Sequence, residues 1–406
     1  MHIALVCRWY PPHSGFGGVA MHNFYTARAL VAAGHRVSVV AARWSADAPA
    51  VEQCDGVVVH RLLSRHRPWV HRLPVVGRHA RGFVQGCYSR QVARALRELE
   101  RSDPPDVIEF ADIEAEGHAY LRGPAGCPVV IRCHTPAFVL HRYYRPEERP
   151  WATERIEARE RACIGWAGAL TAPSRDMART IAAECGLPEG RVAVIPNALE
   201  VEPFVKAGRQ AAGGRADGRE VVILHVGRLD RGKGIAVLAE AIPEVLAEVP
   251  AARFVFVGQD RNDGQGGTWL ARLDETLRRR GARDRVEFTG AVTQPELVAW
   301  YGRADVAVVP SLIYESFSYT CAQAAAAGLP VVASRIGGIP DTIPDNVAGI
   351  ITDPGDARQL AAALVRLARD PDARRRLGAA GQEKAVREFN APTVAAQLLR
   401  LYSGLA

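Results

Sequence analysis

The chain has 406 residues, which is too long for one ordinary hydrophobic core and predicts two domains of about 200 residues each. Its composition, 48% hydrophobic and 23% charged, is typical of a globular protein and excludes a disordered one. The formal net charge is +7, but six arginines and no acidic residue lie in the single segment 61–81, and without them 45 basic residues face 44 acidic ones. A charge excess this local argues against a nucleic-acid-binding protein.

The basic segment 61–81 has two interpretations. It is either a solvated surface of no special role, or a region that recognises an anionic acceptor or an anionic lipid. Trp69 and Val70 within it keep a peripheral membrane contact open as a hypothesis.

The eight cysteines are scattered, and no two form a CxxC pair. This pattern suggests neither a disulfide framework nor a zinc site. The first residues contain no basic leader before the apolar run, which is therefore predicted to be a strand rather than a signal peptide. A reducing cytoplasm is the expected location, and no apolar run approaches the ~18 residues of a membrane span.

The N-terminal half alternates predicted strands with helices, as in a parallel sheet covered by helices. The first predicted elements are a strand at Ile3–Cys7, a glycine-containing loop at Arg8–Gly18, a helix at Val19–Ala33 and a strand at Val37–Ala41. Further strands are predicted at Val107–Phe110, Val129–Arg132 and Ala169–Ala172.

A second series of the same kind begins at Val221–Val226. Its predicted helix is Ile235–Leu246, and its further strands are Phe254–Val257, Val286–Phe288, Val306–Val309 and Val331–Ala333. The stretch Lys206–Arg219 is rich in Gly, Ala and polar residues and is predicted to be a linker or surface excursion, which places the domain boundary near 199–220. The chain ends in a predicted amphipathic helix at Pro392–Leu405. The predicted fold class is therefore α/β, with two Rossmann-like, doubly wound domains, in which ligands bind beyond the carboxyl ends of strands.

The first candidate binding motif is the loop Gly227–Gly234 between a strand and a helix. Arg228 and Lys233 in this loop are suited to hold a diphosphate and to neutralise the charge that grows on a departing phosphate. The spacing does not fit a Walker loop, and a basic loop with only a structural role is the alternative.

The second motif follows the strand that ends in Val309. A helix is expected to begin near Ser318, so the backbone N–H groups of Phe317, Ser318 and Tyr319 would be available at its N-terminus. Glu315 just before them is suited to bind paired sugar hydroxyls, or else to stabilise the helix dipole.

A cluster of acidic residues flanks the predicted strand Val107–Phe110. These residues are Asp106, Glu109, Asp112, Glu114 and Glu116. They are expected either to bind a polar or cationic acceptor or to form a solvated loop and helix cap.

Together these motifs resemble glycosyltransferase family 4, the retaining enzymes of GT-B fold, and the resemblance covers nearly the whole chain. Besides Arg228, Lys233 and Glu315, it includes the glycine loop Gly15–Gly18, Arg132–Pro136, Val194–Asn197, Val286–Gly290 and Gly328–Ser334. The resemblance implies an N-terminal acceptor domain (1–200), a donor domain (201–387) and a last helix (about 388–406) that packs back on the first domain.

The resemblance also implies roles for single residues. Gly17 and Gly18 would lie in a loop that approaches the diphosphate and acceptor, and His134 would lie at the reacting sugar. Val286 and Phe288 would lie near the nucleoside, while Phe317, Ser318 and Tyr319 would adjoin the donor. The family's second glutamate, a ribose contact, is replaced here by Gln323, which is expected to keep that contact through its amide oxygen.

The resulting prediction is a retaining hexosyltransferase with the catalytic residues His134, Arg228, Lys233 and Glu315. Its co-substrate would be a nucleoside-diphosphate sugar, of UDP or GDP, with no further cofactor and no metal site. The acceptor would be a small molecule, a glycan or a lipid-linked molecule. A GT-B-fold epimerase or phosphorylase, and a sugar-nucleotide-binding protein without catalysis, remain as alternatives, whereas a dinucleotide oxidoreductase is disfavoured because no clear GxGxxG follows the first strand.

Overall fold

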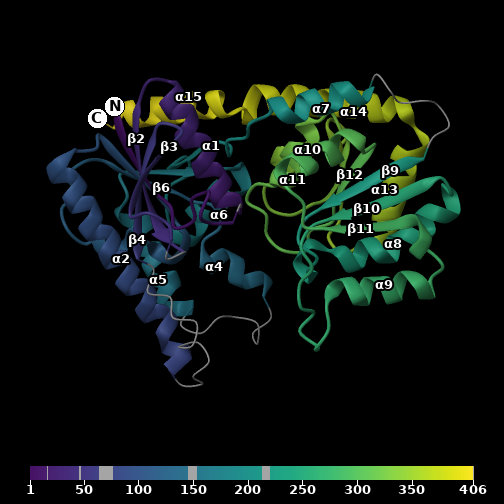
Figure 1. Cartoon of the computed structure of the whole chain (residues 1–406), viewed down its shortest axis with the longest axis horizontal. Coiled ribbons are helices and arrows are strands. Elements are labelled where there is room, and N and C mark those ends of the chain that lie inside the picture. The colour runs from purple at the N-terminus through teal and green to yellow at the C-terminus, as the bar shows by residue number, and fades with distance from the viewer. Residues whose placement is uncertain (16, 45–46, 64–75, 145–152, 213–219, 406) are drawn as a thin grey trace. The chain divides into compact units, whose positions relative to one another are not determined.

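The computed structural model describes residues 1–15, 17–44, 47–63, 76–144, 153–212 and 220–405. The chain forms two compact units (Figure 1). The first unit comprises Met1–Leu199 together with Ala391–Ala406, and the second comprises Glu200–Asn390.

The first unit contains an eight-stranded sheet in the order β3-β4-β2-β1-β5-β6-β7-β8. All its pairings are parallel except the β3–β4 hairpin. Its strands are β1 (His2–Val6), β2 (Arg36–Arg43), β3 (Val51–Cys54), β4 (Val57–Leu63), β5 (Val107–Ala111), β6 (Val129–Arg132), β7 (Ala169–Ala172) and β8 (Val192–Val194). Every residue of β1, β5, β6 and β7 is buried, as expected for strands that helices cover on both faces.

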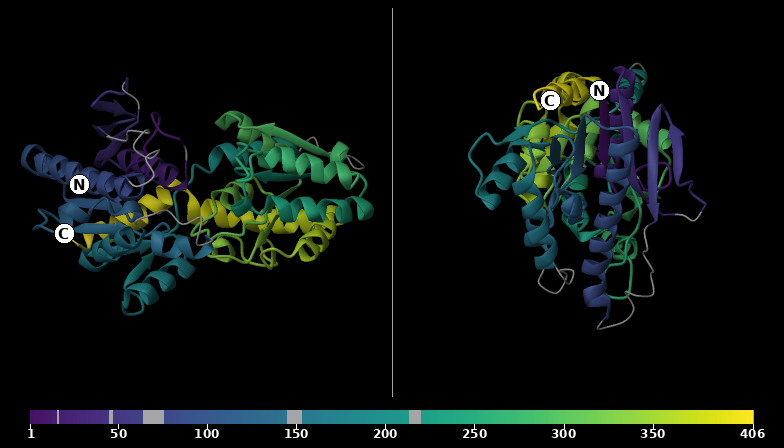
Figure 2. Two further views of the ribbon diagram at one scale, coloured as in Figure 1. Left: turned by 90° about the horizontal axis from the view of Figure 1, so that it is seen from below. Right: turned by 90° about the vertical axis from the view of Figure 1, so that its left-hand side faces the viewer.

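Helices from both ends of the chain belong to this unit. They are α1 (Gly18–Ala32), α2 (Val76–Ser102), α3 (His118–Leu121), α4 (Ala137–Leu140), α5 (Thr153–Trp166), α6 (Arg175–Cys185) and α15 (Ala391–Ser403), with short 3-10 turns η2 (Ile113–Ala115) and η3 (His141–Tyr143). A hydrogen bond joins the last helix to the sheet, since the Tyr402 hydroxyl donates to the buried Glu109 carboxylate at 2.8 Å. The two chain ends consequently lie close together (Figures 1 and 2).

The second unit contains a six-stranded parallel sheet in the order β11-β10-β9-β12-β13-β14. Its strands are β9 (Val221–Val226), β10 (Ala252–Val257), β11 (Val286–Gly290), β12 (Val306–Val309), β13 (Val331–Ser334) and β14 (Gly349–Thr352). Its helices are α7 (Glu202–Ala212), α8 (Ile235–Glu248), α9 (Trp269–Arg279), α10 (Gln294–Arg303), α11 (Tyr319–Ala326), α12 (Ile339–Thr342), α13 (Ala357–Arg369) and α14 (Pro371–Lys384), with the turns η5 (Arg231–Lys233), η6 (Arg283–Arg285) and η7 (Ala385–Phe389). Apolar residues of α8, α9 and α13 pack on the sheet as one hydrophobic core.

The structure confirms the predicted α/β class, and each strand predicted from an apolar run is present with ends shifted by one or two residues at most. The prediction for Lys206–Arg219 is wrong in its first half, because residues 206–212 continue helix α7. This helix has buried apolar residues, Phe204 and Val205, on the side that packs against α10 and α11. Residues 213–219 lie outside the described residues.

The prediction of a basic surface at 61–81 is wrong at its first residue. Arg61, the only one of its six arginines whose side chain is described, is buried rather than on a basic surface. It pairs with Glu52 and donates to the carbonyl oxygens of Tyr10 and Pro11, each at 3.1 Å. The rest of the proposed surface, Trp69 and Val70 included, lies outside the described residues or has no described side chain.

All eight cysteines are free. Among the helices that the structure describes, none combines the length and the apolar character that a membrane span requires.

Candidate active site

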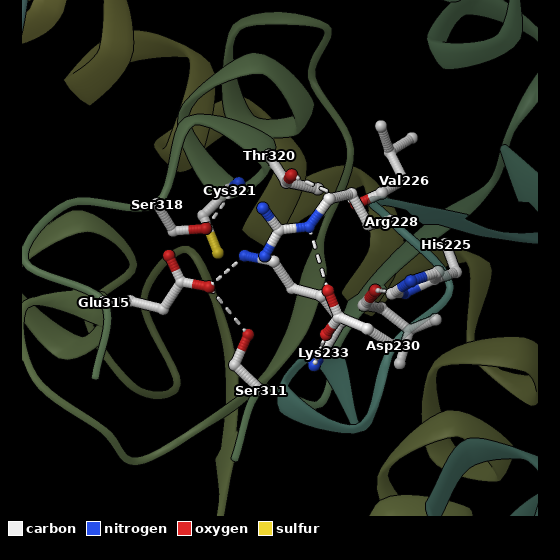
Figure 3. A network of polar contacts seen from close by, with 11 residues as sticks. His225, Val226, Arg228, Asp230, Lys233, Ser311, Glu315, Ser318, Thr320 and Cys321 are labelled. Atoms are coloured by element: carbon white, nitrogen blue, oxygen red, sulfur yellow. Dashed lines mark hydrogen bonds and ion pairs between the residues drawn. The ribbon is translucent and has the colours of Figure 1, made fainter. Parts of the chain in front are cut away.

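Lys233 and Glu315, 82 positions apart in the sequence, form an ion pair in the second unit (Figure 3). The Lys233 ammonium donates to Glu315 Oε1 at 2.5 Å, and the Ser311 hydroxyl donates to the same oxygen at 3.0 Å. Both charged side chains are mostly shielded from solvent, with 24% and 14% of their surfaces exposed. The structure therefore brings together two of the residues predicted to be catalytic, and it adds Ser311, which the sequence did not single out.

Two glycines allow the loops that carry these residues to meet. Gly234 has φ +67°, and a Cβ there would lie 1.7 Å from the Pro310 carbonyl oxygen. Gly337 has φ +53°, and its Cβ would lie 2.5 Å from the carbonyl oxygen of Glu315. Only glycine adopts these angles without strain and leaves room for the neighbouring backbone. The glycines therefore set the position of Lys233 against Glu315.

Arg228 lies in the same loop and is oriented by Asp230 (Figure 3). Arg228 Nε donates to Asp230 Oδ2 at 2.9 Å, while Asp230 Oδ1 accepts the backbone N–H of Lys233 at 3.1 Å. The Arg228 side chain is half exposed, so its other N–H groups remain accessible to a ligand. Asp230 was not predicted, although its place three residues before Lys233 at the start of a helical turn is a recognisable capping signal.

The predicted helix start near Ser318 is confirmed. Ser318 precedes α11, and its hydroxyl accepts the backbone N–H of Cys321 at 3.4 Å. Phe317 is buried, with its ring centroid 5.2 Å from that of Tyr319 and 5.3 Å from that of Phe389. The Phe317 side chain thus fixes the loop from within, and only the backbone here is suited to meet a donor.

The amide oxygen of Gln323 already accepts one hydrogen bond inside the second unit. Its side chain is buried, and Oε1 accepts the hydroxyl of buried Tyr301 at 3.0 Å. An amide oxygen has two lone pairs, so Oε1 can still accept a second hydrogen bond, and the ribose contact stays a prediction. Gln323 also links α10 to α11 through its bond with Tyr301.

A leucine at position 323 should reduce the stability of the second unit. Gln323→Leu leaves the buried Tyr301 hydroxyl without this acceptor, at an expected cost of about 1–3 kcal/mol. The double variant Gln323→Leu/Tyr301→Phe removes both polar groups and should recover most of that loss. Urea unfolding of the three proteins measures the effect, and equal stability of the single and double variants would contradict it.

Val286 and Phe288, which were predicted to lie near the nucleoside, both pack at the core of the second unit. Val286 belongs to the hydrophobic core of the second unit. Phe288 packs against the same core, with its ring centroid 5.1 Å from that of Phe256. Residues two apart in a strand point to the same face, so both side chains face the core, and the contact of this strand with the nucleoside stays a prediction.

His134 follows β6 in the first unit and packs against a second histidine that was not predicted. Its ring lies edge-on to that of His22 of α1, with centroids 5.3 Å apart. Nε2 of each ring is buried without a hydrogen-bond partner among the described residues. Burial, and secondarily the Arg132 guanidinium, lowers the pKa of His134 well below its ordinary value, so the ring is neutral at neutral pH.

His22 has a defined tautomer. Its Nδ1 accepts the backbone N–H of Ala198 at 3.2 Å, so the proton of the neutral ring is on Nε2. Buried Arg132 binds the same stretch of chain by donating to the Ile195 carbonyl at 2.7 Å and to Asn197 Oδ1 at 2.8 Å. These bonds position the end of the first unit beside His134.

Gly17 and Gly18 lie at the N-terminus of α1, as the predicted loop requires. Gly17 is the residue before the helix, and a Cβ placed on it would have no heavy atom of the described chain within 4 Å. No described side chain caps this helix. The first backbone N–H groups of α1 are therefore accessible to an anion or a hydroxyl.

The acidic cluster around β5 is largely buried. Glu109, Asp112 and Glu116 are buried, and Glu114 pairs with Arg8. Asp106 accepts the backbone N–H of His2 at 2.6 Å. The prediction of a solvated loop is wrong for the three buried carboxylates, whereas Asp106 is exposed and a role in acceptor binding stays a prediction.

Buried carboxyl groups make this unit sensitive to pH. Burial raises the pKa of Asp112 to about 7 and that of Glu116 to about 8. At these two carboxyls the folded protein retains protons that the unfolded chain releases, so they contribute a fall in the free energy of unfolding as pH rises from about 4 to about 8. Asp112→Asn should flatten this fall below about pH 7, as urea unfolding across that range would measure, and an unchanged slope would count against it.

Comparison with known proteins gives the class of the chain. Residues 220–370 match the family model "Glycosyl transferases group 1", and residues 16–203 match "Glycosyltransferase Family 4". A D-inositol 3-phosphate glycosyltransferase of Thermobispora bispora is 30% identical over 95% of this chain and 90% of its own length. A glycogen synthase of Mycobacterium tuberculosis is 28% identical over 99% of this chain and 94% of its own length.

Solved structures agree on the fold. Sucrose-phosphate synthase of Thermosynechococcus elongatus matches all of this chain and 98% of its own with a TM-score of 0.78 and 25% identity. HepE of Anabaena, solved in complex with UDP, matches all of both chains with a TM-score of 0.71 and 19% identity. The chain is thus a glycosyltransferase with the GT-B fold. It belongs to glycosyltransferase family 4.

Proposed function

We propose that this glycosyltransferase moves a sugar from a nucleoside-diphosphate sugar, of UDP or GDP, to its acceptor with retention of anomeric configuration and without a metal ion. The observation that carries the proposal is the Lys233–Glu315 pair beside Arg228. Two cations next to a sugar-binding carboxylate fit a ligand that joins a diphosphate to a sugar. Anabaena HepE, which shares the fold, was solved with UDP and with UDP-glucose.

In the proposed reaction, Arg228 and Lys233 bind the diphosphate and stabilise its charge as the bond to the anomeric carbon breaks. Glu315 binds hydroxyls of the donor sugar, and neutral His134 donates to or accepts from the reacting sugar. The acceptor oxygen attacks the anomeric carbon from the face that the phosphate leaves, and its proton passes to the departing phosphate oxygen. Retention follows because bond making and bond breaking occur on the same face.

The second unit would bind the donor and the first the acceptor, whether a small molecule, a glycan or a lipid-linked molecule. The free state of all eight cysteines supports a reducing, cytoplasmic setting. No group of three His, Cys, Asp or Glu side chains in the described ranges has the arrangement of a metal site.

Incubation with UDP- and GDP-sugars tests this function. Thermal stabilisation by one nucleoside diphosphate identifies the base, since a hundredfold excess over Kd contributes about 2.7 kcal/mol. Transfer should proceed unchanged in EDTA and give a product of the donor's anomeric configuration. Strict metal dependence or an inverted product would contradict the proposed mechanism, and conversion of the donor without an acceptor would favour an epimerase.

A further inference from the structure

We propose that the first unit contains a second binding site, distinct from the donor site, for a phosphate group on a hydroxylated molecule. The site is a pocket of about 610 Å³ between α2, α3 and α5. Its lining includes Gln85, Arg90, Glu114, His118, Arg122 and Arg159. A pocket of this volume accommodates a small organic ligand.

The lining carries an excess of positive charge. Arg90, Arg122 and Arg159 come from three different segments, and the carboxylate of Glu114 is already paired with Arg8. Arg90 Nε donates to the Gly86 carbonyl oxygen at 3.0 Å. Neither Arg90 nor Arg122 forms an ion pair with a carboxylate in the part of the chain that the structure describes. An anion would therefore meet two cations that internal acids do not neutralise.

Two of the guanidinium groups approach the same point. A Cβ placed on Gly86 would lie 3.5 Å from Arg159 Nη1 and 3.6 Å from Arg90 Nη2. An anion near this point would be within reach of guanidinium groups from two helices. Guanidinium groups present paired N–H donors that match phosphate oxygens, so phosphate is the group that this arrangement favours.

The positive charge of the arginines also acts on His118. Besides burial, Arg159 and Arg122 lower the pKa of His118 below its ordinary value, which means that both guanidinium groups act on its ring. A phosphate dianion bound between the arginines reverses this electrostatic effect and raises that pKa. The histidine thus provides a local probe of this pocket.

Gln85 indicates a second feature of the ligand. This buried residue lines the pocket, and neither its amide nitrogen nor its amide oxygen has a hydrogen-bond partner among the described residues. Buried amides without partners are rare in folded proteins. A ligand hydroxyl can satisfy both a donor and an acceptor of this kind, so the ligand is expected to carry hydroxyl groups beside its phosphate.

Histidine NMR with glycerol 3-phosphate tests the site. The probe should raise the pKa of His118, also in the Lys233→Ala protein, in which phosphate binding at the donor site is impaired. Arg122→Gln and Arg159→Gln should each weaken binding about tenfold or more, as expected for loss of a charged hydrogen bond. Arg101→Gln, an exposed change on the same helix as Arg90, is the matched control and should bind normally.

Two further experiments identify the source of the phosphate group and test the role of Gln85. Flotation with phosphatidylcholine vesicles, with and without phosphatidic acid, shows whether the phosphate group belongs to a lipid. Only a lipid phosphate gives vesicle binding that requires both phosphatidic acid and Arg122. Gln85→Leu should weaken glycerol 3-phosphate more than inorganic phosphate. The proposal is overturned if neither glycerol 3-phosphate nor inorganic phosphate shifts the pKa of His118. It is also overturned if Arg122→Gln and Arg159→Gln both bind glycerol 3-phosphate as well as the Arg101→Gln control does. Donor binding, measured in the same samples, reports separately on the proposed transferase.

Discussion

Lys233→Ala is expected to lower kcat about 10²–10³-fold, the effect of removing one donor that stabilises transition-state charge. The ammonium group is placed to meet charge that grows on the departing phosphate, so its loss acts on the transition state more than on donor binding. It also leaves Glu315 without the partner that holds its carboxylate at 2.5 Å. Arg228→Ala should act in the same direction.

Steady-state kinetics with the donor identified by thermal stabilisation measure this loss. Lys206→Ala is the matched control, because Lys206 is an exposed lysine of the same unit on α7. It should retain full activity. A Lys233→Ala enzyme with unchanged kcat and only a raised KM would show that the lysine binds the ground state alone.

Gly234→Ala is expected to destabilise the second unit by about 2–5 kcal/mol. The added Cβ meets the Pro310 carbonyl oxygen at 1.7 Å, so the backbone must move, and the positive φ adds its own cost. Moving this loop also separates Lys233 from Glu315, so activity should fall by more than the fraction of unfolded protein explains.

Gly264→Ala measures the part of this effect that is due to the backbone conformation alone. Gly264 has φ +78°, but no heavy atom of the described residues lies within 4 Å of its Cβ position. Its replacement should cost only about 1–2 kcal/mol for the backbone conformation. Chemical unfolding and activity compare the two variants, and equal losses would mean that close approach of the loops has no role.

Regular elements are predictable where their apolar runs are long and uninterrupted. The β3–β4 hairpin was not predicted because β3 alternates only weakly and is half exposed, although the Asp55-Gly56 pair between the strands is a recognised turn signal. Helix α7 was not predicted because the composition of its second half is that of a linker, whereas the buried Phe204 and Val205 supply its apolar face.

At the site, the sequence identifies the residues in the glycine loop and beside α11, where function requires particular residue types at fixed spacing. It does not predict partners that come from other elements. Tyr301 reaches Gln323 from α10, and His22 reaches His134 from α1, through tertiary packing that no local pattern encodes. Likewise, the sequence of β11 does not tell that the core covers the face that carries Val286.

The hydrogen bond between α15 and β5 affects the order in which the two units can fold during synthesis. The first unit is assembled from the two ends of the chain, and the second unit is one continuous segment between them. During synthesis the N-terminal sheet leaves the ribosome first, yet the buried Glu109 acquires its partner Tyr402 only after the whole second unit has been translated. The second unit can therefore complete its fold before the first, which reverses the usual order in which domains mature along a nascent chain.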